Sequence, residues 1–309
     1  MPSISVIIPT HNRPHLLPRA IESVWAAGTD VEIIVVDDAS VDETATVCGA
    51  MRDIKYVRLD RNQGAAGARN AGLMVSEAEF VSFLDDDDLR LPGSLDVQRG
   101  LLLRNPDAGF VCGGIAIADQ DYQLTGEVVA PRYPSGDVFW QIMELDFPVM
   151  GLSSLIRKES LLRVGLLRRH LIGIDDWDIF ARLAEIHPAV VTTEAVGVYR
   201  QPTRHSGQGS SARAAQLRRV VRHQLELLKL PRAQSATKKQ RRMVRRRLRN
   251  RIADTSLWNA AQRLPYGEFD QVSENILLAM QLNPTRAISP RGPRRILDAF
   301  AAKRRAAIH

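Results

Sequence analysis

The first 105 residues alternate short apolar runs with longer stretches in which apolar residues recur every three or four positions. The runs predict strands, and the stretches between them predict helices. The expected strands are ISVIIPT (4–10), VEIIVVDD (31–38), IKYVRL (54–59) and EFVSFL (79–84), and the expected helices cover 13–27, 42–51 and 65–77. Strands and helices that alternate in this way are typical of a parallel sheet buried between helices, with right-handed crossovers. The pattern predicts an α/β fold.

The pattern becomes less regular after residue 105. We expect strands at 107–119, 124–130 and 189–200, and helices over 136–146, 159–164 and 175–186. In the last of these helices Ile179, Leu183 and Ile186 share one face, which predicts that this face packs on a core. The segment QPTRHSGQGSSAR (201–213) breaks every periodicity and is typical of a loop.

Charge divides the chain near residue 205. Residues 1–204 hold 19 Lys and Arg against 29 Asp and Glu, a net charge of −10, whereas residues 205–309 hold 23 against 6, a net charge of +17. From residue 212 the pattern is helical, with Leu217, Val221, Leu225 and Leu228 in one stripe and nine Lys and Arg among residues 238–251. A shift of this size predicts a domain boundary, and we place the domains at 1–210 and 211–309.

The first residues, the longest apolar runs and the two cysteines indicate where in the cell the protein is expected. The first residues lack the basic and apolar pattern of a signal peptide, and no apolar run reaches the ~18 residues of a membrane span. Cys48 and Cys112 fall in a helical and a strand pattern, which favours buried free thiols over a disulfide. We therefore expect a cytoplasmic protein.

Acidic residues follow two of the expected strands. Asp37 and Asp38 end one strand, and Asp85 to Asp88 follow another. In open α/β sheets ligands bind at the carboxyl ends of strands. Four adjacent carboxylates repel one another, and a divalent cation such as Mg²⁺ or Mn²⁺ would remove the conflict. A solvated turn is the alternative reading of the four-Asp run taken alone.

Five segments in order complete a family pattern. They are SVIIPTHNRPHLLPRAIESV, EIIVVDDASVDET, NQGAAGARNAGL with FVSFLDDDDLRLPGSL, GIDDWDIFARLA and VYRQPTRHSGQGS. This set closely resembles the family 2 glycosyltransferases over residues 3–210. The resemblance implies the GT-A fold, a Rossmann-like and mostly parallel sheet flanked by helices. It implies a nucleotide-binding half (1–105) and an acceptor-binding half (106–210), and it leaves the basic helical extension (211–309) outside.

The resemblance also implies roles for single residues. The nucleotide would contact Pro9, Thr10, Arg13, Asp37, Asp38, Arg69, Asp85 and Asp86. The metal would be held by Asp87 and Asp85, with His205 as a further contact, although the run of four Asp leaves the register open. Asp176 would be the general base, supported by Asp175 at the start of a helix. An N-terminal helix cap is the alternative reading of that pair.

The implied activity is inverting transfer of a sugar from a nucleotide-diphosphate sugar, with a UDP-sugar favoured, to a hydroxyl acceptor. The acceptor would be a saccharide, a lipid-linked saccharide or another glycoconjugate, and the cofactor Mn²⁺ or Mg²⁺. A nucleotidyltransferase is the alternative, although PTHNRPHLL lacks the Gly-rich basic loop it would need.

The basic tail has three readings: nucleic acid, an anionic membrane surface, or packing on the acidic domain or a second subunit. The absence of a zinc or recognition-helix pattern disfavours nucleic acid. A basic amphipathic helix suits peripheral contact with the inner face of a membrane.

Overall fold

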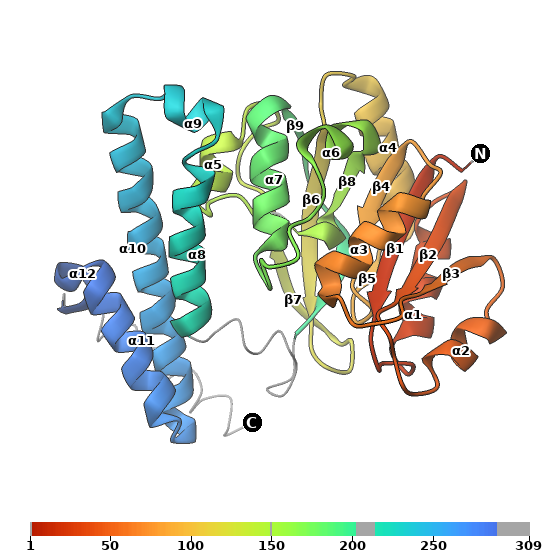
Figure 1. Cartoon of the computed structure of the whole chain (residues 1–309), viewed down its shortest axis with the longest axis horizontal. Coiled ribbons are helices and arrows are strands. Elements are labelled where there is room, and N and C mark those ends of the chain that lie inside the picture. The colour runs from red at the N-terminus through yellow and green to blue at the C-terminus, as the bar shows by residue number, and fades with distance from the viewer. Residues whose placement is uncertain (1, 149, 202–213, 289–309) are drawn as a thin grey trace. The chain divides into compact units, whose positions relative to one another are not determined.

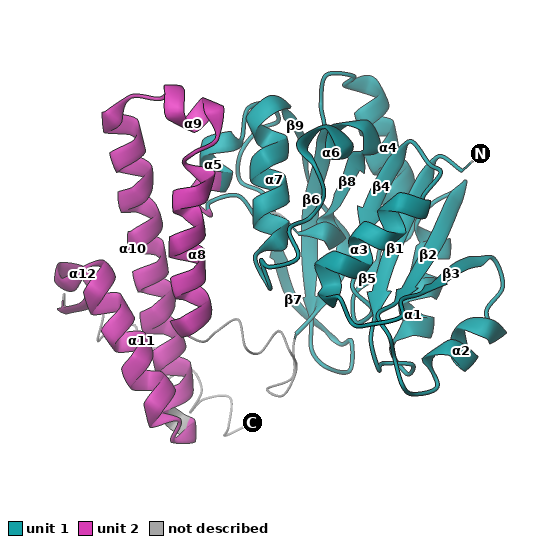
Figure 2. Cartoon of the chain, viewed as in Figure 1, with its two compact units in different colours: residues 1–142, 146–201 teal, residues 143–145, 202–309 magenta. Residues whose placement is uncertain are grey.

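The computed structural model describes residues 2–148, 150–201 and 214–288. The chain divides into two compact units, one of residues 1–142 and 146–201 and the other of residues 143–145 and 202–309 (Figure 2). The first unit contains the sheet, and the second is helical. His205 and Arg204 lie outside the described residues, as does most of the loop expected at 201–213.

The first unit begins with alternating strands and helices (Figure 1). Its elements are β1 (Ile4–Thr10), α1 (Leu17–Ala27), β2 (Val31–Asp37), α2 (Thr44–Ala50), β3 (Ile54–Arg58), α3 (Gly64–Val75), β4 (Phe80–Phe83), β5 (Leu89–Arg90) and α4 (Ser94–Arg104). It continues with β6 (Phe110–Ala118), β7 (Leu124–Val129), α5 (Phe139–Met143), η1 (Gly151–Ser153), β8 (Ser154–Arg157), α6 (Lys158–Val164), α7 (Asp175–Ile186) and β9 (Ala189–Arg200).

Among the described residues the strands form one nine-stranded sheet. The order is β3-β2-β1-β4-β8-β6-β9-β5, with β7 paired to β6. The first four strands in this order run parallel, so the carboxyl ends of β1, β2 and β4 lie at one edge. The antiparallel pairs involve β8, β5 and β7, and β6 pairs parallel with β9.

Helices cover both faces of the parallel part, which explains its continuous apolar runs. Every residue of β1 is buried. Val6 and Ile8 join the cluster that contains the apolar face of α1. Ile7 points to the other face and packs closely against Gly72 of α3. A Cβ atom added to Gly72 would lie only 2.4 Å from Cγ2 of Ile7. Alternation of side chains across a strand therefore gives each helix its own apolar surface.

The apolar pattern did not identify strands β5 and β8 or helix α4. Strand β8 lies between β4 and β6 in the sheet, and β5 lies at its edge beside β9. In α7 the predicted core positions Ile179 and Leu183 are fully buried, but Ile186 is 48% exposed, so its assignment was wrong. Helix α7 ends at Ile186, where the chain turns towards β9.

The second unit consists of helices in its described part: α8 (Ala214–Leu227), α9 (Pro231–Ser235), α10 (Lys238–Arg263), η3 (Leu264–Tyr266), α11 (Phe269–Leu282) and α12 (Pro284–Ile288). The stripe predicted for α8 was partly wrong, because Leu217 and Leu228 are buried but Leu225 is 48% exposed. In α10, Val244, Leu248 and Ile252 are buried one turn apart. None of the described helices is long and apolar enough to span a membrane.

Candidate active site

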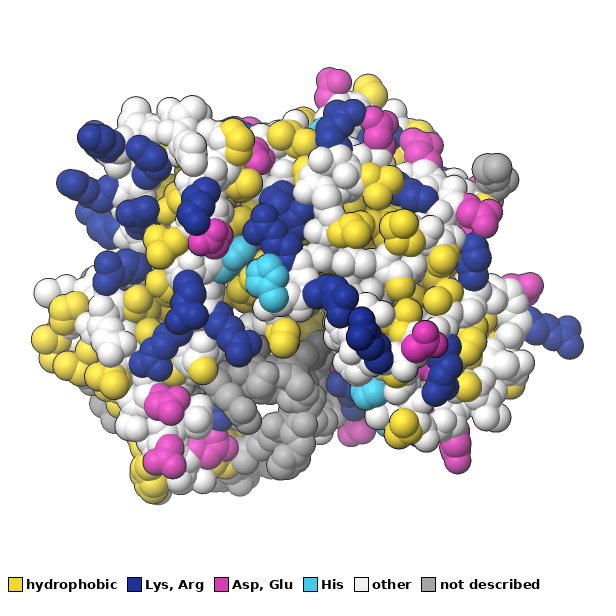
Figure 3. All heavy atoms as spheres, viewed as in Figure 1, with side chains coloured by type: hydrophobic (Ala, Val, Ile, Leu, Met, Phe, Trp, Pro, Cys, Tyr) yellow, Lys and Arg dark blue, Asp and Glu magenta, His cyan; other side chains and the backbone are white. Residues whose placement is uncertain are grey.

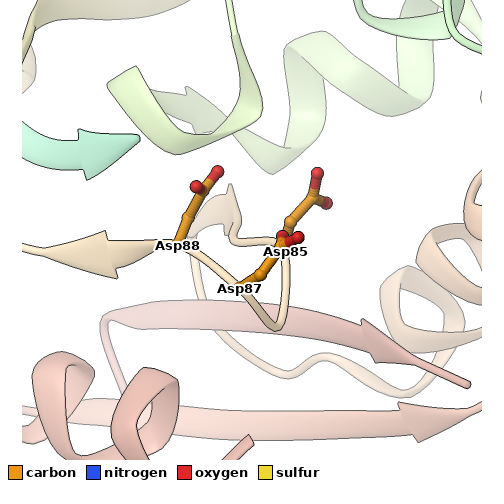
Figure 4. A group of neighbouring side chains, drawn as sticks. All are labelled: Asp85, Asp87 and Asp88. Atoms are coloured by element: carbon orange, nitrogen blue, oxygen red, sulfur yellow. The ribbon is translucent and has the colours of Figure 1, made fainter. Parts of the chain in front are cut away.

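Three of the four consecutive Asp residues form one cluster. Asp85, Asp87 and Asp88 lie on the loop between β4 and β5, and each offers a carboxylate oxygen within 4.8 Å of the others (Figure 4). The loop turns back on itself because the Asp88 N–H donates to the Asp85 carbonyl at 3.1 Å. The tight turn brings side chains from positions 85, 87 and 88 to one side.

The cluster suits a hard divalent cation. Burial raises the pKa of the Asp87 carboxyl, with Asp85 adding to the shift, and it raises the pKa of Asp88 strongly for the same reasons. Asp87 Oδ1 is buried and accepts no hydrogen bond from the described residues. An all-carboxylate donor set is the kind that Mg²⁺ and Mn²⁺ prefer, and a bound cation would relieve the mutual repulsion.

Asp86 is not part of this cluster, and its side chain contacts the end of β1 and the turn that follows it. Its carboxylate accepts from Thr10 Oγ1 at 2.7 Å and from Arg13 Nη1 at 2.9 Å. Arg13 also reaches Asp87 Oδ2 at 3.0 Å, so one guanidinium bridges both acids. Burial raises the pKa of Asp86 to about 6, against the opposing effect of Arg13. Thr10, Arg13 and Asp86 are thus brought together, as the shared edge of β1 and β4 predicts.

Arg69 joins the acidic loop to Asp175, which lies 106 residues further along the chain than Arg69. From the middle of α3 it donates to Asp85 Oδ1 at 2.5 Å and to Asp175 Oδ2 at 2.6 Å. Its Nη1 lies 3.6 Å from Asp176 Oδ1. The side chain is nearly fully buried, and although burial opposes the charge, Asp85, Asp176 and Asp175 raise the pKa of the guanidinium. Arg69 is therefore a permanent cation at the centre of the site.

Asp176 occupies the first turn of α7. Its side chain is 29% exposed, but its Oδ1 atom is buried. One oxygen accepts from the Gly151 N–H at 3.1 Å, and the other, Oδ1, accepts no hydrogen bond from any described residue. Burial raises the pKa of Asp176 to about 6; Arg69 opposes this shift, and Asp175 and Asp85 add to it. The Gly151 N–H holds the carboxylate on one side, and on the other side its buried Oδ1 faces the Arg69 guanidinium.

Asp37 is held by a network at the end of β2. Its fully buried carboxylate accepts from the Ser40 N–H at 2.8 Å, the Tyr56 hydroxyl at 2.6 Å and Arg58 Nη1 at 3.2 Å. Burial opposes ionisation, but these partners outweigh it and lower the pKa of Asp37. Because its oxygens are already engaged, Asp37 chiefly shapes the turn that places Ser40 opposite the Asn12 N–H.

Asp38 caps the next helix. Its two oxygens accept from the Gln63 N–H at 2.7 Å and the Gly64 N–H at 2.8 Å, at the start of α3. These are N–H groups that a helix cannot satisfy internally. Pro9, another residue predicted to contact the nucleotide, is buried within β1 beside Val36.

Sequence reasoning did not select Asp88 or Tyr122. The Tyr122 hydroxyl donates to the Asp87 carbonyl at 3.1 Å, and Asp88 Oδ1 accepts from the Arg200 N–H at 2.9 Å. Asp88 stood in the quoted run, but spacing within four identical residues does not show which side chains converge. No sequence pattern pointed to Tyr122, because it lies in a loop 34 residues after Asp88.

Comparison with known proteins identifies the family. The family model described as glycosyl transferase family 2 matches residues 5–161, about half of the chain. The chain belongs to glycosyl transferase family 2. The matched region runs from β1 into α6 and therefore includes the acidic loop and Arg69.

Curated relatives within this family match part of the chain. A Campylobacter jejuni protein, GalNAc(5)-diNAcBac-PP-undecaprenol beta-1,3-glucosyltransferase, is 47% identical over 117 residues, which cover 36% of this chain and 36% of that protein. The Escherichia coli protein WfgD, UDP-Glc:alpha-D-GlcNAc-diphosphoundecaprenol beta-1,3-glucosyltransferase, is 33% identical over 132 residues, 42% of this chain and 51% of that protein. The chain thus spans between a third and a half of these relatives.

Solved structures of glycosyltransferases share the fold over nearly the whole chain. S. aureus TarS 1-349 aligns with a TM-score of 0.64 at 17% identity, covering 96% of this chain and 89% of that one. The mannosyltransferase PcManGT from Pyrobaculum calidifontis, in complex with GDP-Man and Mn²⁺, aligns at 0.59 and 18% identity, covering 100% and 81%. The predicted GT-A fold, a mixed α/β sheet flanked by helices, is confirmed.

Proposed function

We propose that this family 2 protein is an inverting glycosyltransferase that moves a sugar from a nucleotide-diphosphate sugar to an acceptor hydroxyl. The observation that carries the proposal is the meeting of two acidic groups around Arg69: the Asp85, Asp87 and Asp88 cluster on one side and Asp175 with Asp176 on the other. A leaving diphosphate needs stabilised negative charge, and an attacking hydroxyl needs a base. The arrangement has candidates for both.

The base in this proposal is Asp176. Its Oδ1 is buried 3.6 Å from Arg69 Nη1 and has no hydrogen-bond donor among the described residues, so we assign to it the proton of the acceptor hydroxyl. The Gly151 N–H holds the second oxygen, and the start of α7 favours an ionised carboxylate there. Asp175 would be a positioning residue, because its carboxylate is engaged by Arg69.

A divalent cation, Mn²⁺ or Mg²⁺, would be held by Asp85, Asp87 and Asp88, with His205 retained as a predicted contact. When bound, it would act as a Lewis acid that stabilises the leaving diphosphate. Arg69 neutralises part of the carboxylate charge around the site and keeps Asp85 oriented. Arg13 and Thr10 orient Asp86, and we place the nucleotide beside Arg13, at the edge of the sheet where Asp37 and Asp38 also lie.

The comparisons support a UDP-sugar donor and a lipid-linked acceptor. TarS has been solved with UDP and with UDP-GlcNAc, and WfgD is named for transfer from UDP-Glc to a saccharide on diphosphoundecaprenol. We therefore propose a UDP-sugar and a saccharide carried on a lipid diphosphate as the first substrates to test. Membership of family 2 favours glycosyl transfer over the nucleotidyltransferase alternative.

We further propose that α10 contacts an anionic membrane surface, where such an acceptor would lie. Lys238, Arg241, Arg242 and Arg245 line a hollow of about 390 Å³ on this helix. No acidic residue occurs between Glu226 and Asp254. Figure 3 shows Lys and Arg side chains gathered over this unit. Charged helices of this kind bind anionic bilayers without spanning them.

The central test is a thermal-shift panel of UDP-, GDP- and dTDP-sugars, each with and without Mn²⁺. A ligand that binds only the folded chain raises the unfolding temperature according to its affinity. We expect the largest shift with a UDP-sugar and Mn²⁺ together. The variant Asp87→Asn should lose the Mn²⁺-dependent part of the shift, because it removes a ligand from the cluster.

The matched control is Asp53→Asn, an exposed site at the amino end of β3, where the left-handed backbone (φ 58°) tolerates Asn. This variant should behave as the wild type. An Asp87→Asn protein with an undiminished Mn²⁺ response would show that the cation is bound elsewhere. The absence of a response to every nucleotide sugar would argue against the proposed activity.

A further inference from the structure

Tyr122 adopts an unusual backbone conformation beside the acidic loop. It lies in the connection between β6 and β7 with φ of 63°, the left-handed region that bulky side chains rarely enter. The connection is closed by bonds from the Asp119 N–H to the Gln123 carbonyl and from the Tyr122 N–H to the Asp119 carbonyl. Such strain persists where the surrounding structure requires it, often at functional sites.

Two cations gather on the ring of Tyr122. The guanidinium of Arg19, from α1, lies 4.5 Å from the ring centroid, and that of Arg200, from β9, lies 5.3 Å away. Among the described residues neither arginine forms an ion pair with an acidic side chain, although Arg200 Nε donates to the Gln120 carbonyl at 2.7 Å and the Arg200 charge opposes the rise in the pKa of Asp87. Two like charges on one ring repel each other, so this arrangement would be favoured by an anion that contacts both.

A cavity of about 340 Å³ opens at this point. It is lined by His15, Leu16, Arg19, Gln120, Asp121, Tyr122 and Arg200. A second cavity of about 490 Å³ shares Arg19, Asp121 and Tyr122 with it and adds Glu22 and other polar residues. The smaller cavity has the higher density of basic groups, with His15 and two arginines against a single carboxylate.

The cavity is connected to the acidic cluster through its own lining residues. The Tyr122 hydroxyl donates to the Asp87 carbonyl, and the Arg200 N–H donates to the Asp88 carboxylate. The other arginines near the cluster are already paired with carboxylates, Arg13 with Asp86 and Asp87 and Arg69 with Asp85 and Asp175. Arg19 and Arg200 are therefore the basic groups best able to accept a new anion.

We propose that the cavity between Arg19, Tyr122 and Arg200 is a binding site for a phosphate or diphosphate group, separate from the Asp85, Asp87 and Asp88 cluster. Guanidinium groups suit phosphate because their planar N–H donors match two oxygens at once. Tyr122 serves as a platform that holds the two arginines apart and towards the cavity. The phosphate belongs either to the nucleotide donor or to a phosphorylated acceptor.

The direct test is calorimetric titration of the full chain with inorganic pyrophosphate, at constant ionic strength and with a chelator present so that no cation occupies the cluster. We expect Arg19→Gln to weaken binding by about tenfold or more, because a charge-assisted contact is lost. Arg200→Gln, on a different element, should also weaken it. The control Arg52→Gln, an exposed arginine just before β3, should bind as the wild type.

The proposal would be overturned if the wild-type chain did not bind pyrophosphate, if Arg19→Gln bound it normally, or if Arg52→Gln weakened binding equally. The last outcome would indicate general charge attraction instead of a site. Because Arg19 is exposed, its substitution should leave the unfolding temperature unchanged, and this is measured on the same samples.

Kinetics then identifies the source of the phosphate, and this arm alone rests on the proposed function. A raised KM for the donor in Arg19→Gln assigns the site to the donor. A raised KM for a glycosyl-diphosphate acceptor, with no change for an unphosphorylated saccharide, assigns it to the acceptor. If neither KM changes, the site does not serve the reaction. Pyrophosphate binding is measured without turnover. That result can therefore be interpreted even if the chain has no transferase activity.

Discussion

At the scale of single residues, the site is organised by one buried cation and the carboxylates around it. Arg69 contacts Asp85 and Asp175 directly and lies close to Asp176. Its side chain is only 6% exposed, so little water can reach these contacts. Its positive charge lowers the electrostatic cost of holding several carboxyl groups close together in a buried place.

The variant Asp176→Asn tests whether Asp176 acts as the base or binds the donor. The amide keeps the size of the side chain and its bond from the Gly151 N–H but cannot accept a proton. We expect turnover to fall by ~10²–10⁴, the usual contribution of a positioned base, with little change in donor affinity. Asp175→Asn should cost less turnover. Near-normal turnover in Asp176→Asn would place the base elsewhere, and loss of donor binding would assign Asp176 to the donor site.

The raised pKa of Asp176 predicts how turnover depends on pH. With a pKa of about 6, the carboxyl is ionised at neutral pH and becomes protonated as the pH falls through about 6. Only the ionised form accepts a proton, so kcat should decline on the acid side of about pH 6 and level off above it. The measurement is kcat at saturating substrates from pH 5 to 8. A flat profile across this range would contradict the assignment.

At the scale of elements, the site depends on how helices begin. Helix α3 starts where Asp38 accepts the N–H groups of Gln63 and Gly64, and that start places Arg69 one and a half turns into the helix. Helix α7 starts with Asp175 and Asp176. The N-cap position of α7 is Ile174 and no side chain caps it, so the reading of this acidic pair as a helix cap is not supported, although both acids lie in the first turn.

The capping role of Asp38 predicts an effect on folding in the ligand-free chain. Asp38→Ala leaves the Gln63 N–H without its partner and the Gly64 N–H with only Asn62 Oδ1, and it should lower the free energy of unfolding by about 1–2 kcal/mol. Asp38→Asn keeps an acceptor oxygen and should lower it less. Urea denaturation followed by circular dichroism measures both variants. Equal stability of Asp38→Ala and wild type would mean that α3 begins without this cap.

At the scale of the whole molecule, charge is divided between two parts of the chain. Residues 1–204 carry a net charge of −10 with the acidic site, and residues 205–309 carry +17. The basic face of α10 is exposed at Lys238, Arg242 and Arg245. A polyanionic surface would be attracted to this part and repelled by the other, which would orient the chain.

This division predicts salt-sensitive binding to anionic vesicles through α10. Each basic residue close to such a surface contributes on the order of 1 kcal/mol. Replacing Lys238, Arg241, Arg242 and Arg245 by Gln should therefore lower the affinity for phosphatidylserine vesicles at least tenfold. Affinity is measured by cosedimentation with the vesicles. Neutral vesicles are the control, and the variant Arg242→Gln with Arg245→Gln should be intermediate. Equal binding to neutral and anionic vesicles would exclude the membrane proposal and favour the contact with a second subunit.

The sequence by itself determined the α/β class, the parallel half of the sheet and the edge at which the acidic residues lie. Periodicity is a local property, and acids that follow parallel strands must lie at one edge, so the acidic run after β4 could be placed near the end of β1 without coordinates. Strand β9 was predicted with its observed bounds, Ala189–Arg200, because its β-branched run is long.

Only the tertiary structure decided which side chains converge. Four identical acids in a row give no periodicity to choose between them, and the fold of the β4–β5 loop turns Asp86 one way and Asp85, Asp87 and Asp88 the other. Contacts between distant segments, such as Arg69 with Asp175 or Tyr122 with Asp87, have no local signal. The short strand β8 escaped detection because its place in the sheet comes from its neighbours β4 and β6, which supply the hydrogen bonds that four residues cannot form alone.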